Sequence, residues 1–405
     1  MKLQTQRAID RWLGQFLCAL VSAWVGLTQR GAATLPAQPR HIVVILLSEM
    51  GSIVLAGPMF AQLRRRFPTA QIHVLQLQKN QEVARLLALT EQSRLHTLDD
   101  SSGLRLLRDI LLFSWRMRQL GVDAVVDCEL FSRVSSLLSF ACGAPVRVGF
   151  TPHTQEGLYR GSFIHHSIPY NPYQHISKQF LSLVDALTDT GAPRNKPAPT
   201  RVIPLEPELA VDFSPTELAS YRAQLHKDHP ATVERRLVLL YAGGGLLPER
   251  AWPAAHYARV AQGLCAAGYA VGLIGLKDDA ELARTLRTQI GHEACLDLTG
   301  YTRSIRELLM LFHAASLLIT NDGGPGHFAT LTPIQTMVFF GPETGRLYGP
   351  LGTRNLVLES GIACSPCLSA YNHRQTFCDG DNQCLKRIAP DPVLDQALQF
   401  LGNAA

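Results

Sequence analysis

The sequence lacks the features that mark several large classes of protein. No block of like charges, no stripe of alternating basic and aromatic residues and no internal repeat occurs in its 405 residues. The net charge of +5 is too diffuse to indicate a nucleic-acid partner. Charged residues make up only 18% and hydrophobic residues 46%, which excludes a disordered chain and indicates a folded globular protein.

The chain also lacks an N-terminal apolar run long enough to span a membrane. The run from Trp12 to Leu27 is shorter than the roughly 20 residues that a span requires, and no small-residue cleavage site follows it. Basic residues precede it at Lys2, Arg7 and Arg11. This pattern favours a helix that lies on a membrane surface, with an extra helix packed on the domain as the alternative. We expect residues 1–40 to make peripheral membrane contact.

Cysteine is scarce outside one cluster. Five cysteines are scattered through apolar segments, which predicts small buried residues and a reducing, cytoplasmic compartment: Cys18, Cys128, Cys142, Cys265 and Cys295. The other four are close together in the sequence: Cys364, Cys367, Cys378 and Cys384. A C-x₂-C pair followed by two more thiols is compatible with a structural zinc, and two disulfides or four free thiols are the alternatives.

Apolar, strand-like runs alternate with helical periodicity along most of the chain. This alternation predicts an α/β protein with two doubly wound, Rossmann-like domains, each built on a parallel sheet. The first domain is predicted at 41–191 and the second at 235–360, joined by a proline-rich linker at 192–234. A cysteine-rich segment and a closing helix are predicted at 361–405, and this helix could cross back to the first domain.

Two glycine-rich turns follow predicted strands in the second half. Leu317–Thr320 is apolar or β-branched, and Asn321–His327 then has the sequence Asn-Asp-Gly-Gly-Pro-Gly-His. Such a turn lets a phosphate approach the backbone and directs amide groups towards it. Gly243–Gly245 is the second turn. Because ligands of parallel sheets bind at the carboxyl ends of the strands, both turns are candidate ligand sites.

These motifs and their order resemble glycosyltransferase family 9, typified by ADP-heptose:lipopolysaccharide heptosyltransferases. The resemblance rests on the turn above and on these further segments: Leu46–Ala56, Arg147–Phe150, Gly243–Gly245 with Arg250–Pro253, Phe340–Pro342 and Tyr348–Pro350. It covers most of residues 41–390. Asp127–Ser135 and Tyr170–Tyr173 resemble a less studied subgroup, so the donor sugar is left open.

The resemblance implies a GT-B architecture, with two Rossmann-like domains facing a central cleft. It implies inverting, metal-independent transfer from a nucleotide sugar, with an ADP-sugar favoured, to a lipopolysaccharide or other lipid-linked glycan at the inner face of the inner membrane. No catalytic cofactor is expected. The implied donor-binding residues are Gly244, Gly245, Arg250, Asp322, Gly323, Gly324 and His327. Arg250 would stabilise the diphosphate, and its guanidinium suits a phosphate. The alternatives are a surface charge for Arg250 and a packing residue for His327.

On the acceptor side the sequence departs from the family pattern. We expect acceptor contacts from Met50, Gly51, Arg133 and Arg160. The aspartate that resembles a general base in the family is replaced by Ser52, which cannot act as a base near neutral pH.

The nearest carboxylate to Ser52 in the sequence is Glu49, and Asp127 and Glu129 are further candidates for the base, although each could be a solvated or capping carboxylate. One alternative is a non-catalytic nucleotide-sugar-binding homologue, and another is a nucleotide-sugar epimerase of similar build.

Overall fold

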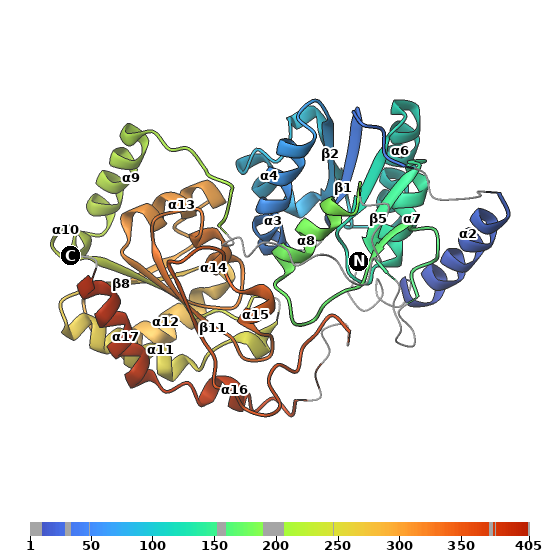
Figure 1. Cartoon of the computed structure of the whole chain (residues 1–405). Coiled ribbons are helices and arrows are strands. Elements are labelled where there is room, and N and C mark those ends of the chain that lie inside the picture. Colours follow the sequence, from blue (N-terminus) through green and yellow to red (C-terminus); the bar gives the residue numbers. More distant parts are fainter. Residues whose placement is uncertain are drawn as a thin grey trace. The chain divides into compact units, whose positions relative to one another are not determined.

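The computed structural model describes residues 10–28, 34–47, 49–151, 159–188, 206–245, 247–371, 376 and 378–403. The chain divides into two compact units, unit 1 at 1–208 and unit 2 at 209–405 (Figure 1). Each unit contains one six-stranded sheet whose paired strands are all parallel. The predicted α/β class with two parallel sheets is therefore confirmed. Within the described residues, no helix has the length and apolarity that crossing a membrane requires.

The sheet of unit 1 has the strand order β3-β2-β1-β4-β5-β6. Its strands are β1 (His41–Ile45), β2 (Gln71–Leu77), β3 (Leu95–Leu98), β4 (Ala124–Asp127), β5 (Val146–Phe150) and β6 (His166–Ile168). The helices are η1 (Asp10–Gly14), α2 (Gln15–Thr28), α3 (Met50–Leu55), α4 (Gly57–Arg66), α5 (Gln81–Leu86), α6 (Gly103–Leu120), α7 (Arg133–Ala141) and α8 (Ile176–Asp185). The central strand β1 is β-branched and buried beyond its first residue, as a strand covered on both faces requires.

Helix α6 shows how local sequence sets these bounds. The Ser102 side chain accepts a hydrogen bond from the backbone N–H of Arg105, and Gly121 ends the helix in the left-handed conformation, with φ of 62°. Phe113 and Met117 on its inner face pack against the sheet. Helix α7 lies next to α6 and also next to α2, so α7 supports both of them.

Three histidines from adjacent strands form a ladder in unit 1. The Nδ1 atom of His41 lies 3.2 Å from Nε2 of His73, and Nδ1 of His73 lies 3.2 Å from Nε2 of His96. The His96 ring meets Phe113 of α6 edge-on. Burial is the main cause that lowers the pKa of His73 and of His96 to about 4, and the neighbouring charges add to it.

The sheet of unit 2 has the order β12-β11-β10-β7-β8-β9. Its strands are β7 (Leu237–Tyr241), β8 (Ala270–Gly275), β9 (Cys295–Thr299), β10 (Leu317–Asn321), β11 (Gln335–Phe339) and β12 (Asn355–Leu358). The helices are α9 (Pro215–Asp228), α10 (Ala231–Glu234), α11 (Ala254–Ala266), α12 (Ala280–Ile290), α13 (Ile305–Ala314), α14 (Gly324–Ala329), α15 (Gly345–Tyr348), α16 (Gln383–Lys386) and α17 (Pro390–Asn403). Both α9 and α10 belong to this unit, although the sequence places them in the linker.

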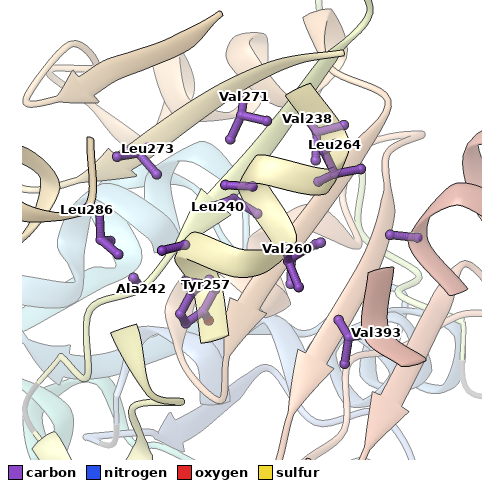
Figure 2. Close-up of a cluster of buried hydrophobic side chains, with 14 of the residues drawn as sticks. Val238, Leu240, Ala242, Tyr257, Val260, Leu264, Val271, Leu273, Leu286 and Val393 are labelled. Atoms are coloured by element: carbon purple, nitrogen blue, oxygen red, sulfur yellow. The ribbon is translucent and has the colours of Figure 1, made fainter. Parts of the chain in front are cut away.

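The core of unit 2 lies between its sheet and helix α11. Figure 2 shows Tyr257, Val260 and Leu264 of α11 beside Leu240 of β7, together with Val393 of α17. Helix α17 packs on α11, so the expectation that the closing helix could cross back to the first domain is wrong. The physical reason is that the buried apolar side chains of α17 complete this core instead.

Four strands were predicted with the bounds that the structure has. The sequence predicts them at Gln71–Leu77, Val146–Phe150, Ala270–Gly275 and Cys295–Thr299, which are β2, β5, β8 and the edge strand β9. The sequence interpretation missed β3, β6 and β12, which are all edge strands. An edge strand is short and partly exposed, so it lacks the continuous apolar run of a central strand. The loop predicted after β5 therefore contains β6, and the helix predicted at 78–89 is reduced to α5 after a 3₁₀ turn.

Candidate functional site

The two predicted glycine-rich turns of unit 2 lie side by side. They follow β7 and β10, which are paired parallel neighbours. The buried amide of Asn321 links them, since its Nδ2 donates to the carbonyl of Gly243 at 2.9 Å and its Oδ1 accepts from the backbone N–H of Trp252 at 2.9 Å. The Tyr257 hydroxyl lies 3.0 Å from the same Oδ1. Asn321 therefore fixes the geometry of both turns.

An ionic cluster lies at the same edge of the sheet. Arg250 is 8% exposed, and its Nη2 donates to Oε2 of Glu343 at 2.8 Å. Its Nε lies 3.3 Å from Oδ2 of Asp322, which is 8% exposed. One guanidinium thus faces two buried carboxylates that come from the turns after β10 and β11. Glu343 was not among the predicted site residues. Its position just after a predicted strand was the only feature of the sequence that could have indicated it.

The cysteine-rich segment holds the turns that carry this cluster. Nδ2 of Asn382 donates to the carbonyl of Glu249 at 2.9 Å, beside Arg250. The backbone N–H of Leu368 donates to the carbonyl of Pro342 at 2.8 Å, beside Glu343. The described part of residues 361–388 therefore belongs to the scaffold of this site.

The predicted donor-binding glycines line the same two turns. A Cβ at Gly244 would lie 2.9 Å from the Cα of Pro248, so a side chain there would displace backbone. Gly245 has φ of 58°, in the left-handed region that favours glycine. Gly323 and Gly324 precede or begin α14, and His327 is buried within that short helix. The structure therefore gathers the predicted donor residues at one edge of unit 2.

In unit 1 the predicted turn lies after β1 and enters α3. Glu49 stands at the N-cap position of α3, and its side chain does not cap the helix. Met50 and Gly51 are the first residues of α3, and the backbone N–H of Ser52 donates to the carbonyl of Glu49 at 2.9 Å. Glu49 and Ser52 are half-buried and sequence neighbours on this turn.

Two other carboxylates considered as bases have structural partners. Asp127 is fully buried, pairs with Arg160 and accepts from the Ser135 hydroxyl at 2.9 Å. Burial raises the pKa of Asp127, although Arg160 opposes this shift. Oε1 of Glu129 accepts from the backbone N–H of Leu47 at 2.7 Å.

The arginines predicted to contact the acceptor lie inside unit 1. Besides Asp127, Arg160 donates to the carbonyls of Glu129, Ser132 and Phe150. Arg133 is 1% exposed. Its Nε donates to the carbonyl of Tyr159 at 2.8 Å, and its Nη1 lies 3.3 Å from Asp10. Both guanidinium groups are thus held inside unit 1 by these partners, and the acceptor role expected of the two arginines stays a prediction.

The five scattered cysteines are buried as predicted. In the cluster, Cys364 and Cys378 are exposed, Cys367 is half-buried and Cys384 is buried. Burial chiefly raises the pKa of Cys384, and the other three thiols contribute, so the four lie in one region. Among the described residues, however, no three His, Cys, Asp or Glu side chains are arranged to hold a metal ion. The structural zinc stays a prediction.

Comparison with known proteins gives consistent matches. The model of glycosyltransferase family 9 (heptosyltransferase) matches residues 115–377. Lipooligosaccharide heptosyltransferase 2 of Haemophilus ducreyi is 22% identical over 368 residues, covering 89% of this chain and 99% of that protein.

Two solved structures share the fold. The ADP-heptose lipopolysaccharide heptosyltransferase II of E. coli has a TM-score of 0.67 at 19% identity, covering 90% of this chain and 100% of that one. A family 9 glycosyl transferase from Veillonella parvula has a TM-score of 0.70 at 20% identity, covering 91% and 99%. The heptosyltransferase-like GT-B fold that the resemblance implied is therefore confirmed.

Proposed function

Since the chain belongs to glycosyltransferase family 9, we propose that it transfers a sugar from an ADP-linked donor to a lipid-linked glycan of the cell envelope. An ADP-heptose is the favoured donor, because heptosyltransferases are among the proteins that the chain resembles over nearly its whole length. The transfer would invert the anomeric centre and would need no metal ion.

The buried cluster of Arg250, Asp322 and Glu343 is the observation that carries this proposal. The bond that breaks joins the sugar to a diphosphate, and a guanidinium in a water-poor site stabilises the negative charge that develops there. The two carboxylates orient the guanidinium. A Cβ at Gly245 or at Gly323 would meet no atom closer than 3.9 Å, so a phosphate can approach the backbone at these two glycines.

The acceptor hydroxyl would be activated in unit 1 by Glu49. Its proton passes to the carboxylate as the hydroxyl oxygen attacks the anomeric carbon, and the bond to the diphosphate breaks to release ADP. Asp127 is excluded from this role by its buried pair with Arg160. Met50, Gly51 and Ser52 share the turn with Glu49 and would contact the acceptor. Ser52 can donate or accept a hydrogen bond there, but it cannot take the proton.

The lipid anchor of the proposed acceptor indicates where in the cell the reaction would take place. Nucleotide sugars and free thiols both suit the cytoplasm, so we place the protein at the inner face of the inner membrane, in peripheral contact with it. The described part of helix α2 is amphipathic and is the predicted contact, whereas Lys2, Arg7 and Arg30 lie outside the described residues.

The test is a transfer assay with ADP-heptose, GDP- and UDP-sugars, using a heptose-free lipooligosaccharide as acceptor. We expect release of ADP only when both substrates are present. Glu49→Gln should lower kcat by roughly 100-fold or more with ADP affinity unchanged, as loss of a general base would. Glu91→Gln, on an exposed turn of the same unit, is the matched control.

Replacement of the family's aspartate by Ser52 favours one alternative, a non-catalytic homologue that binds nucleotide sugars. It predicts tight ADP-sugar binding without turnover on any acceptor, and partial activity in Ser52→Asp. A chain that binds none of the three nucleotides would contradict both hypotheses.

A further inference from the structure

Helix α6 is apolar on two opposite faces. Its inner face contributes Phe113 and Met117 to the core of unit 1. The outer face carries side chains that are all at least 53% exposed: Leu104, Leu107, Leu111, Leu112 and Trp115. Their spacings of three, four and one residues place them along one side of a helix. An ordinary surface helix would carry polar residues there. We refer to these five residues as the α6 face.

The N-terminal helix of the same unit has a similar exposed side. Its buried residues Cys18 and Val25 pack against Phe163 and Ile164. Its outer residues are all at least 52% exposed: Trp12, Leu13, Phe16, Leu20, Trp24 and Leu27. We refer to these six residues as the α2 face. Helices α2 and α6 both contact α7, so the two faces belong to the same unit (Figure 1).

Positive charge accompanies the α6 face. The helix contains Arg105, Arg108, Arg116 and Arg118 and a single acidic residue, Asp109. Arg108 pairs with Asp109 in an exposed ion pair, which is weak and readily exchanged for another anion. The α6 face thus has leucines with arginines between them in the sequence and a tryptophan as its last residue. This composition is typical of helices that lie in the interface of an anionic bilayer.

The α2 face has the aromatic pattern expected at such an interface. Trp12 and Trp24 stand near its two ends, with Phe16 and Leu20 between them. The guanidinium of Arg11 lies 5.5 Å from the ring centre of Trp12. Tryptophan is enriched where apolar chains meet lipid headgroups, because one end of the indole is apolar and the other can donate a hydrogen bond.

We propose that the α6 face and the α2 face together form a docking surface for an anionic lipid bilayer. A second copy of this chain fits less well, since a symmetric pair would bring the arginines of α6 against one another. The α6 face is the new element, and it goes beyond the transfer reaction because adsorption to lipid requires neither donor nor chemistry. A failure here would therefore leave the proposed transfer reaction untouched and would count only against the peripheral membrane contact.

The first test is co-sedimentation of the full chain with vesicles, without donor or acceptor. Vesicles of phosphatidylethanolamine with phosphatidylglycerol should bind the protein more strongly than vesicles of phosphatidylcholine, and added salt should weaken the binding. The double variant Leu111→Gln/Trp115→Gln should lower the partition coefficient roughly tenfold or more. Val233→Gln, which changes an apolar side chain 62% exposed on α10 of unit 2, should bind as the wild type does.

A second measurement leaves the α6 face intact. The sequence has four tryptophans, so Trp12→Phe/Trp24→Phe leaves Trp115 and the buried Trp252. Brominated lipids in the anionic vesicles should quench Trp115, and its emission should shift to the blue. Equal vesicle binding by the α6 double variant, or no quenching of Trp115, would overturn the proposal. So would a wild-type dimer that the α6 double variant dissociates while its vesicle binding is unchanged.

Discussion

Replacing Arg250 by methionine tests the ionic cluster of unit 2 most directly. The variant leaves the carboxylates of Asp322 and Glu343 buried, at 8% and 3% exposure, without their guanidinium. Removing one partner of a buried ion pair costs about 3–5 kcal/mol of unfolding free energy. Arg259→Met is the matched control, because Arg259 pairs with Asp391 at the surface and such pairs contribute about 0–1 kcal/mol.

A second substitution separates the structural role of Arg250 from its role in binding. Arg250→Met/Glu343→Gln replaces one of the two carboxylates that face Arg250 by a neutral amide and should recover part of the lost stability. Its affinity for ADP should stay roughly 10- to 100-fold below that of the wild type, because a charge-assisted hydrogen bond contributes about 1.5–3 kcal/mol. Urea denaturation gives the first quantity and calorimetric titration with ADP gives the second. Recovery of both would show that Arg250 acts only by neutralising its neighbours, and the donor assignment would fail.

Three further outcomes follow from other contacts. Asn321→Ala removes the hydrogen-bond partner of buried backbone groups at both glycine-rich turns. Urea denaturation should therefore show that the unfolding free energy falls by about 2–4 kcal/mol. For the control Asn355→Ala, at a half-buried side chain, it should fall by less than about 1 kcal/mol. Folding lowers the pKa of His73 to about 4 from its ordinary 6.5. The contribution of His73 to the unfolding free energy is therefore complete above pH 6.5 and is lost as the pH falls towards 4. His73 alone should account for a drop of about 1.4 kcal/mol per pH unit in the unfolding free energy there, and His73→Phe should reduce the total slope. Finally, if the protein binds no metal, the exposed thiols of Cys364 and Cys378 should react fast in a disulfide-exchange assay. A slow reaction that becomes faster when a chelator is added would instead establish bound metal.

Sequence alone located the donor half of the site better than the acceptor half. The glycines and Arg250 are close to the ends of strongly apolar strands, and the edge of a parallel sheet gathers such positions whatever the details of packing. Glu343 was not predicted because its partner, Arg250, is 93 residues away in the sequence. No local sequence pattern distinguishes Glu343 from a solvated carboxylate. The same reasoning explains why the edge strands β3, β6 and β12 and the place of α17 were missed: they depend on long-range packing rather than on local periodicity.

Two buried arginines show what local sequence could not resolve. Arg160 and Arg250 both follow polar stretches, and both were predicted to bind substrates. In the structure Arg160 donates to four backbone carbonyls and pairs with a single carboxylate, so its charge is balanced inside the fold. Arg250 instead faces two carboxylates on turns at the carboxyl edge of the sheet. A pair enclosed by carbonyls is what a rigid interior requires. Arg250 instead lies at the carboxyl edge of its sheet, where ligands of parallel sheets bind, so an incoming diphosphate can compete with the two carboxylates for the N–H groups of its guanidinium.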